Sequence, residues 1–519
     1  MSVSLVVIAT DAWAQECACD HEVTPETLTI NGVDMGVQAG ETICVQGGSR
    51  PFLRVYDMVG TAEAPIVIKN CGGQVVIDNS DRGYGLTLDG SSFVRITGTG
   101  DEAHLYGFRV RASRAGPDYS ASCIVAAGMS TDYEIDHIEA FECGFAGVSA
   151  KTDPSCDARD LSGFVQRNSR LHHLYLHDTG GEGIYFGSTG FPSRTRRCDG
   201  VDVELIPHTH EGVWIHDNII EDTGWDGAQV GVSPRDCFVY RNRISRVGLE
   251  MEQDQMQGLQ IGGGSRCQIF DNFLSNGSAN GIIVLDAADT SIENNVIVDF
   301  ETSIYINDRD SEVTEGAQYR VVHNTVVGAS RRGVTLFGSR SAGNVVANNL
   351  IVAAGDSPLG IGADVDASDE ANLILASGDE ALFVDAAGHD YQLTKLSPAV
   401  DYGVGPQTSG VEIDQLGAMR DDKPDAGAFE FGATPPDEPT SPPEPGQGPG
   451  QPGGEPGEEP GDDGDGDPEG MGGASGGCSY RDIPPGHGPE GRWLLAAAVA
   501  ALLLLRRRSG RAGVGERAP

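Results

Sequence analysis

The chain has 519 residues, 72 of them glycine, and a formal net charge of −42 from 77 Asp and Glu against 35 Lys and Arg. A field of that sign repels nucleic acid and argues against a DNA or RNA partner. Residues 15–434 are too many for one compact domain, whereas a solenoid accommodates them because it grows in one dimension.

The first 14 residues have the pattern of a secretory signal peptide. Ser4–Ala14 is an apolar run ending in Ala-Trp-Ala, a small-x-small cleavage pattern, although no basic residue precedes it. We expect cleavage near Ala14. The alternative is a buried first strand or cap of the folded domain.

Residues 15–434 carry a repeat that is typical of a solenoid. The pattern apolar-x-x-Asn-x-apolar recurs with spacings of 24, 30, 23, 29 and 25 residues, centred on Asn218, Asn242, Asn272, Asn295, Asn324 and Asn349. A second signature, Gly followed by alternating apolar residues, accompanies it at Gly183, Gly227, Gly258, Gly281 and Gly333. Short alternating segments at this period indicate coils of β-strands that stack on one continuous core.

This repeat resembles the right-handed parallel β-helix proteins, the group that includes pectate lyases. The resemblance implies an all-β solenoid in which stacked Asn side chains satisfy backbone groups at an inward turn. In two earlier coils, His137 and His173 stand in the Asn place. Residues 39–68 resemble the first coil of the chondroitinase-B-like and alginate-lyase-like branch. Residues 414–430 resemble the closing motif of secreted β-helices, which predicts a cap.

Alternation along one strand of each coil predicts a row of side chains on the outside of the solenoid. Tyr185, Gln229 and Gln260 fall in this row, and Lys151 points outward one coil before Tyr185. An aromatic ring can stack on a sugar face while amides bond its hydroxyls. We therefore expect a polysaccharide partner, bound by a monomer.

Two aligned acidic segments precede two of these strands. The alignment stacks Asp178 under Asp222 and brings Glu182 close to Asp226, so we expect four carboxylates to meet beside Lys151. Like charges at that spacing favour a cation or a shared proton, and calcium takes six to eight oxygen ligands. The sequence thus predicts a calcium site, with solvated turn residues as the alternative.

The resemblance to β-helix lyases implies a basic residue that abstracts a proton next to a uronate carboxylate neutralised by calcium. On that basis Lys151 is the predicted base, with Glu182 and Asp226 as further catalytic residues, in β-elimination of uronate polymers. One alternative is a glycoside hydrolase that uses two acids. Another is a non-catalytic adhesin or structural protein, because this fold hosts many activities.

Ten cysteines precede residue 300, an even number that favours disulfides in an exported chain. Cys237 and Cys267 occupy equivalent places in successive coils, so they can form a disulfide or remain stacked thiols. Residues 188–211 form a predicted insertion, tied by Cys156–Cys198. Its His208 and His210 are a possible metal pair or ordinary surface residues.

After residue 434 the composition changes abruptly. Residues 435–475 are predicted to be a disordered acidic Pro/Gly linker, with 11 acidic and no basic residues in 435–470. Residues 476–519 contain Cys478, a short apolar helix at 493–505 and three arginines. This end resembles the sorting tag of myxobacterial surface proteins, which implies sorting machinery that processes and lipidates Cys478. The alternative is a plain membrane anchor. Either predicts display at the cell surface or outer membrane.

Overall fold

A computed structural model describes residues 17–114, 121–285, 289–308, 317–338, 340–405 and 409–435, which all belong to one compact unit. The predicted signal peptide, the linker from residue 436, the apolar helix 493–505 and Cys478 lie outside the described residues. Within the described ranges, no helix is long and apolar enough to span a membrane.

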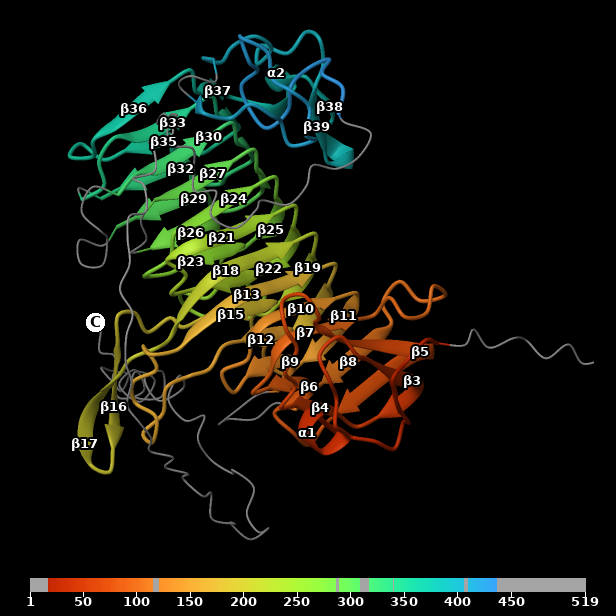
Figure 1. Cartoon of the computed structure of the whole chain (residues 1–519). Coiled ribbons are helices and arrows are strands. Elements are labelled where there is room, and N and C mark those ends of the chain that lie inside the picture. The colour runs from red at the N-terminus through yellow and green to blue at the C-terminus, as the bar shows by residue number, and fades with distance from the viewer. Residues whose placement is uncertain are drawn as a thin grey trace, which may run out of the picture. The chain divides into compact units, whose positions relative to one another are not determined.

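The described residues form a right-handed parallel β-helix, as predicted (Figure 1). One sheet, here called sheet B, has one strand per coil and 12 strands among the described residues. Its strands are β2 (Thr29–Asn31), β4 (Leu53–Tyr56), β6 (Tyr84–Asp89), β9 (Ser122–Ala127), β12 (Val148–Ala150), β15 (Ile184–Phe186), β20 (Ala228–Val230), β23 (Leu259–Ile261), β26 (Asn280–Leu285), β29 (Thr302–Asn307), β32 (Arg332–Phe337) and β35 (Ser357–Ile361).

The other long sheet, sheet A, has 23 strands in the described part of the chain and is bent at a corner into two runs. Its first run comprises β1 (His21–Val23), β3 (Thr42–Arg50), β5 (Ile66–Asn79), β7 (Ser92–Thr97), β10 (Thr131–Asp136), β13 (Val165–His172), β18 (Thr209–His216), β21 (Arg235–Tyr240), β24 (Cys267–Phe270), β27 (Thr290–Glu293), β30 (Tyr319–Val322), β33 (Asn344–Ala347) and β36 (Ala367–Glu370). The second run comprises β8 (Phe108–Ala112), β11 (Ile138–Cys143), β14 (Tyr175–Thr179), β19 (Ile219–Thr223), β22 (Arg243–Val247), β25 (Phe273–Gly277), β28 (Val296–Val298), β31 (Thr325–Val327), β34 (Leu350–Val352) and β37 (Leu373–Leu375). The long β5 pairs with both β7 and β8.

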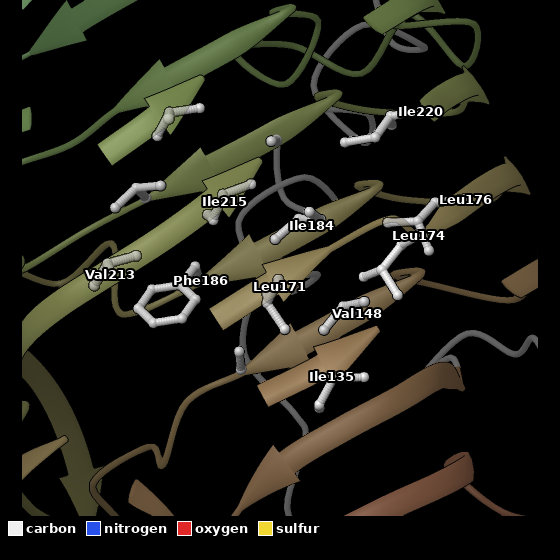
Figure 2. Packing of buried hydrophobic residues seen from close by; sticks show 14 of the residues in the cluster. Ile135, Val148, Leu171, Leu174, Leu176, Ile184, Phe186, Val213, Ile215 and Ile220 are labelled. Atoms are coloured by element: carbon white, nitrogen blue, oxygen red, sulfur yellow. The ribbon is translucent and has the colours of Figure 1, made fainter. Parts of the chain in front are cut away.

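Inward side chains of both sheets fill the centre of the solenoid, as the alternation predicts. Ile135, Leu171 and Ile215 are in register on three successive coils and are fully buried (Figure 2). Ile184 and Phe186 enter the same core from sheet B. The stack therefore shares one apolar core, in which each coil is covered by its neighbours.

The asparagine ladder is confirmed at the corner of sheet A. Asn272 Nδ2 donates to Oδ1 of Asn295 at 2.9 Å and to the carbonyl of Val239 at 2.8 Å. The same bonds link every member from Asn218 to Asn349, and the structure adds Asn372, whose Oδ1 accepts from Asn349 at 2.8 Å. Each side chain thus satisfies backbone groups that the turn leaves without sheet partners.

The expected place of the two histidines is wrong by one residue. His137 and His173 have φ values of 54° and 51°, as does Asp217 at 53° immediately before Asn218. The Asn place itself is taken by apolar Ile138 and Leu174, and the Leu174 N–H donates to Oδ1 of Asn218. The histidines therefore occupy the left-handed position that precedes the ladder.

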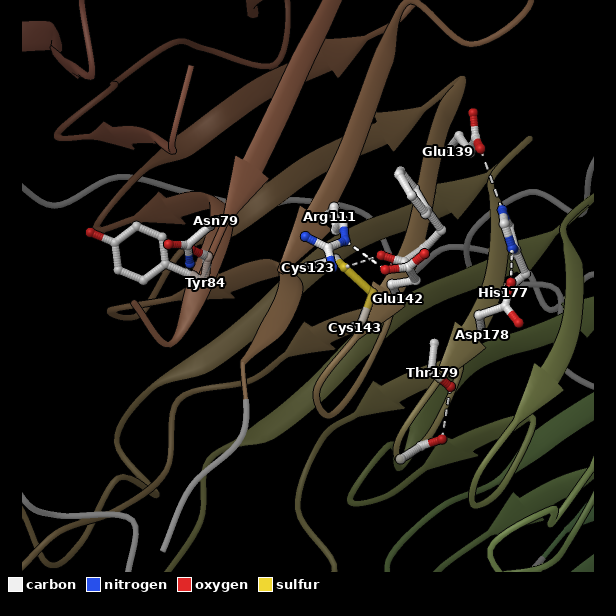
Figure 3. The surroundings of a disulfide bond; sticks show 12 residues. Asn79, Tyr84, Arg111, Cys123, Glu139, Glu142, Cys143, His177, Asp178 and Thr179 are labelled. Atoms are coloured by element: carbon white, nitrogen blue, oxygen red, sulfur yellow. Dashed lines mark hydrogen bonds and ion pairs between the residues drawn. A yellow bond between two sulfur atoms is a disulfide. The ribbon is translucent and has the colours of Figure 1, made fainter. Parts of the chain in front are cut away.

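The two predicted disulfides are confirmed. Cys237 and Cys267 pair between β21 and β24, with Cα atoms 4.5 Å apart, and Cys156 pairs with Cys198. Three further disulfides occur in the described residues: Cys17–Cys71, Cys19–Cys44 and Cys123–Cys143. The last lies beside Arg111 in Figure 3.

The predicted insertion contains an antiparallel hairpin, β16 (Arg194–Cys198) and β17 (Val201–Leu205). Its end differs from the expectation, because Thr209–Glu211 already belong to β18 of sheet A. The insertion therefore leaves sheet B after β15 and rejoins the solenoid at β18.

The closing segment packs on the flank of the solenoid rather than across its end. Gln415 Nε2 donates to the carbonyl of Asn272, and the Asn294 side chain donates to the carbonyl of Ile413. The last strand of the first run of sheet A, β36, is largely exposed. Small elements precede this segment, namely α2 (Gly378–Ala381), β38 (Phe383–Asp385), a 3-10 turn (Ala386–Gly388) and β39 (Asp390–Leu393), while α1 (Gly32–Met35) lies in the first coil. The segment predicted to be a cap thus binds along the side of the solenoid.

Candidate functional site: the outward face of sheet B

The outward face of sheet B carries a central row of side chains in register. Ser149, Tyr185, Gln229 and Gln260 are direct partners on β12, β15, β20 and β23, followed by Ile283, Tyr305 and Thr335. Their neighbours Ile184 and Phe186 are buried in the core, so the predicted alternation holds. The structure thus brings the predicted binding residues Tyr185, Gln229 and Gln260 together.

A second row runs beside it. Each of its members stands two residues before the first inward residue that its coil contributes to sheet B. The backbone N–H groups of Gly147, Gly183 and Gly227 donate to the carbonyls of Glu182, Asp226 and Gln257. Glu182 and Asp226 are therefore neighbours on adjacent coils, and parallel strands lie ~4.7–4.9 Å apart. The row continues through Asn280, Thr302 and Arg332. This part of the predicted carboxylate cluster exists.

Both carboxyl groups are buried, with exposed fractions of 2 % for Glu182 and 0 % for Asp226. Burial raises the pKa of Glu182 to about 7, although attraction to Lys151 opposes the rise. Burial also raises the pKa of Asp226 well above its ordinary range, and repulsion by Glu182 adds to the rise. Asp226 Oδ1 accepts from the N–H of Gln257 at 2.7 Å.

One oxygen of each acid is unsatisfied within the described part of the chain. Glu182 Oε2 and Asp226 Oδ2 are buried there without a hydrogen-bond partner. Because leaving a buried polar atom unpaired costs about 1–3 kcal/mol, such a pair is favoured where a ligand or a shared proton completes it. Neutral or singly ionised, the pair can donate a proton.

Lys151 follows β12 and lies next to Tyr185. Its Nζ is 3.7 Å from the centroid of the Tyr185 ring and 3.1 Å from Oδ2 of Asp153. Burial alone lowers the pKa of Lys151, but Tyr185 and Asp153 outweigh burial and raise that pKa above its ordinary value. Lys151 is therefore a cation at neutral pH, a state that suits charge stabilisation rather than proton abstraction.

The site also contains two aromatic residues that the sequence interpretation missed. Phe145 and Trp225 lie on either side of Gly181, with ring centroids 5.6 Å apart, and Phe145 is 6.0 Å from Tyr185. A Cβ on Gly181 would fall 2.6 Å from the Phe145 ring, so the missing side chain makes room for it. The signal was present in the aligned acidic segments, where Trp225 directly precedes Asp226.

The two glutamines are covered. Gln260 Nε2 donates to Oε1 of Gln229 at 3.0 Å, and Gln229 is only 1 % exposed. The insertion reaches this face, because Phe191 lies against Gly264, where a Cβ would be 2.7 Å from its ring. Gln229 Nε2 has no partner among the described residues. The two amides are thus largely buried, and the insertion packs against the same coil as Gln260, at Gly264.

The other two predicted calcium ligands lie elsewhere, and the expected four-carboxylate site is wrong in this respect. Asp178 and Asp222 occupy left-handed positions within β14 and β19 of sheet A. Asp178 Oδ2 is 2.7 Å from Nδ1 of His177, as Figure 3 shows, and Asp222 forms an ion pair with Arg246. Since calcium takes six to eight oxygen ligands, the predicted set does not fit one calcium ion.

The histidines of the insertion border the site without forming a predicted metal pair. The rings of His208 and His210 have centroids 4.4 Å apart, and His208 Nε2 accepts from the Thr152 N–H at 3.1 Å. Burial lowers the pKa of both groups. The positive charge of Lys151 lowers both pKa values further, so the two rings lie near that residue.

Further along the same face lies a hollow of about 260 Å³. Asn280, Thr302, Tyr305 and Arg332 line it, and all four belong to the two rows described above. Tyr305 and Phe337 form an edge-to-face pair with centroids 6.1 Å apart. The polar face therefore extends several coils beyond the acid pair.

Comparison with known proteins agrees with the fold. A family model described as the right handed beta helix region matches residues 205–374. Among solved structures, the chain is similar to pectate lyase Pel9A, with 13% identity, 80% of this chain and 97% of that one covered, and a TM-score of 0.41. It is also similar to the GH136 lacto-N-biosidase from Eubacterium ramulus, with 11% identity, 68% of this chain and 67% of that one covered, and a TM-score of 0.43. A third similar structure is XylC in complex with xylose, with 11% identity, 79% of this chain and 98% of that one covered, and a TM-score of 0.42. No curated protein matches the chain. At these identities the likeness concerns the fold alone.

Proposed function

We propose that the outward face of sheet B binds a polysaccharide and that Glu182 and Asp226 cleave it by glycoside hydrolysis. The observation that supports this most is the pair of buried acids, each with an unpartnered oxygen, in a row beside Tyr185 and Lys151. A carboxyl group with a pKa near 7 still holds its proton at neutral pH and can act as a general acid.

In the proposed reaction, Glu182 donates its proton to the glycosidic oxygen as the bond to the anomeric carbon breaks. When the pair carries one proton and that proton lies on Glu182, the Asp226 carboxylate takes a proton from the water that attacks the anomeric carbon, and the remaining hydroxyl becomes part of the new reducing end. The Lys151 cation stabilises the charge that Glu182 acquires on losing its proton, because attraction to Lys151 lowers the pKa of that acid. Tyr185 and Trp225 offer ring faces to the sugar.

This proposal departs from calcium-assisted elimination for two reasons. An eliminating base must be deprotonated, and the raised pKa of Lys151 works against that. The acids that remain together are two rather than four, too few to hold calcium by themselves. Proton donation by a buried acid uses the features that the structure does bring together.

A non-catalytic binding protein is the second candidate. The near-complete burial of Glu182, Asp226 and Gln229 favours it, because a substrate reaches these groups only if covering side chains move. The half-buried Phe145, Tyr185 and Trp225 would then bind sugar without cleaving it.

The test is incubation of the full-length protein with a panel of neutral and acidic polysaccharides. Hydrolysis releases reducing ends without an ultraviolet-absorbing unsaturated product, and Glu182→Gln should lower kcat by about 10²–10⁴-fold. Asp178→Asn, a conservative change at the exposed corner, is the matched control and should leave kcat unchanged. An unsaturated product would overturn hydrolysis in favour of elimination. Binding without any product would favour the second candidate.

We also propose that the β-helix is displayed outside the cell, held by the C-terminal tag. The support is the composition of the chain: an acidic Pro/Gly stretch, then Cys478, an apolar run and an arginine cluster. A solvated stalk of this kind would hold the binding face away from the membrane.

A further inference from the structure

Three consecutive coils carry a pair of polar side chains at the corner of sheet A, on a different face from the site above. The pairs are Asp136–His137, His172–His173 and His216–Asp217. Asp136, His172 and His216 are direct partners in register, and the second member of each pair has a left-handed φ. The pairs therefore stack along the solenoid.

The middle pair differs from its neighbours. In the outer coils an imidazole meets a carboxylate: His137 Nδ1 is 2.6 Å from Asp136 Oδ1, and His216 Nδ1 is 2.6 Å from Asp217 Oδ2. In the middle coil two imidazoles face each other, with His172 Nδ1 and His173 Nδ1 2.8 Å apart. Two nitrogens thus converge where the adjoining coils have a nitrogen and an oxygen.

The position of the protons follows from the partners. His172 Nε2 is 3.1 Å from Glu134 Oε1, and an ionised carboxylate only accepts hydrogen bonds. Nε2 of a neutral His172 therefore carries the proton, which leaves Nδ1 with a free lone pair aimed at His173. A carboxylate that fixes one ring nitrogen in this way is the usual outer partner of a metal-binding histidine.

Two carboxylates lie close to His172. Asp136 is fully buried, and its carboxylate lies with Glu134 and His172 in a group whose ligand atoms are all within 4.8 Å of one another. Arg95 bonds Glu134 and Asp136, and Arg241 bonds Asp217, so these acids are held in place.

Access is open on one side. His173 is exposed, whereas His172 is mostly covered, with its ring stacked on His216 at 4.7 Å between centroids. The ring of His173 stacks on His137 at 4.9 Å. An ion can therefore approach from solvent and meet one fixed ring and one accessible ring.

We propose that His172 and His173 bind one divalent transition-metal ion of the zinc class through their Nδ1 atoms, with water completing the coordination. Imidazole nitrogen suits zinc, copper and nickel, whereas calcium and magnesium take oxygen ligands. Two nitrogens at 2.0–2.1 Å from a tetrahedral ion lie about 3.3 Å apart, so the rings separate by about 0.5 Å. The proton on His173 Nδ1 moves to its exposed Nε2, and no net proton is released from the neutral pair.

The experiment is isothermal titration of the full-length protein, prepared without a polyhistidine tag, with zinc chloride and separately with calcium chloride. His173→Asn is the informative variant, because the residue is exposed and Asn tolerates the left-handed conformation. We expect it to weaken zinc binding at least tenfold and to abolish the zinc-dependent rise in Tm. Melting without zinc shows whether the variant folds.

The matched control is His177→Gln, which changes a histidine of the same coil that pairs with the Asp178 carboxylate. It should leave zinc affinity unchanged. Equal zinc affinity in wild type and in a His172→Gln/His173→Asn double variant would overturn the proposal. The proposal would also be overturned if zinc did not raise the Tm of the wild-type protein. Polysaccharide cleavage is measured separately on the sheet B variants, so either proposal can fail without the other.

Discussion

Arg420 donates a hydrogen bond from Nη2 to Oδ1 of Asn294, 126 residues earlier in the chain, at 2.9 Å. The same guanidinium donates to the carbonyl of Gly427 and pairs with Glu430 at 3.2 Å, while its side chain is fully buried. One arginine thus joins the closing segment to the flank of the solenoid through charge-assisted bonds.

Arg420→Met should therefore loosen the closing segment. Removing one partner of a buried ion pair leaves Glu430 with an uncompensated charge, and costs of about 3–5 kcal/mol are typical. Limited proteolysis should cut within 394–431 faster in the variant, and urea unfolding should report the loss. Arg331→Met is the control, because its pair with Glu301 is exposed and such pairs contribute about 0–1 kcal/mol. An equal loss of unfolding free energy in both variants would contradict the role of Arg420 in holding the closing segment.

Asn272→Ala should destabilise the β-helix by about 1–3 kcal/mol, because it orphans buried backbone groups of its own and neighbouring coils. The Asn272 side chain donates to Val239 O and Asn295, and accepts from the N–H of Asn242. Thermal melting measures the change, with the exposed Gln392→Ala as control. Identical melting of Asn272→Ala and the parent would show that the ladder adds nothing to stability.

The raised pKa of Glu182 predicts a pH dependence of stability. Its folded pKa, about 7, exceeds the ordinary value of 4.5, so between these values the folded state binds more protons than the unfolded state. The contribution of this group to stability thus falls as pH rises from about 4.5 to 7, by about 3 kcal/mol.

Glu182→Gln should remove that slope, so the variant should gain stability over wild type as pH rises from 4.5 to 7.5. Unfolding by urea at several pH values measures the difference. Glu252→Gln, at an exposed position, is the control and should keep the wild-type slope. If the difference in unfolding free energy between Glu182→Gln and wild type stays constant with pH, Glu182 is ionised in the folded protein.

Deletion of residues 476–519 should release the protein into the medium with its β-helix intact. The physical reason is that the apolar run and arginine cluster are the predicted attachment, while the described β-helix lies before residue 436. Cell fractionation followed by melting of the released protein checks both parts. Deletion of 440–470, which keeps the tag, should leave the protein on cells. If the protein that lacks residues 476–519 stays on cells, the anchor lies elsewhere in the chain.

The sequence by itself determined the solenoid, since period, alternation and the asparagines that satisfy a turn are local properties repeated in every coil. For the same reason it placed Cys237 opposite Cys267 and Glu182 beside Asp226: one residue per coil at one register needs no long-range information. Only the tertiary structure decided which acids face which side. Asp178 and Glu182 are four residues apart, yet the chain turns between them, so one meets His177 within β14 of sheet A and the other is buried beside sheet B. It also decided the protonation of the site, because burial, not residue type, moves the pKa of Glu182. It decided where the insertion packs as well, since no repeat predicts the path of that loop.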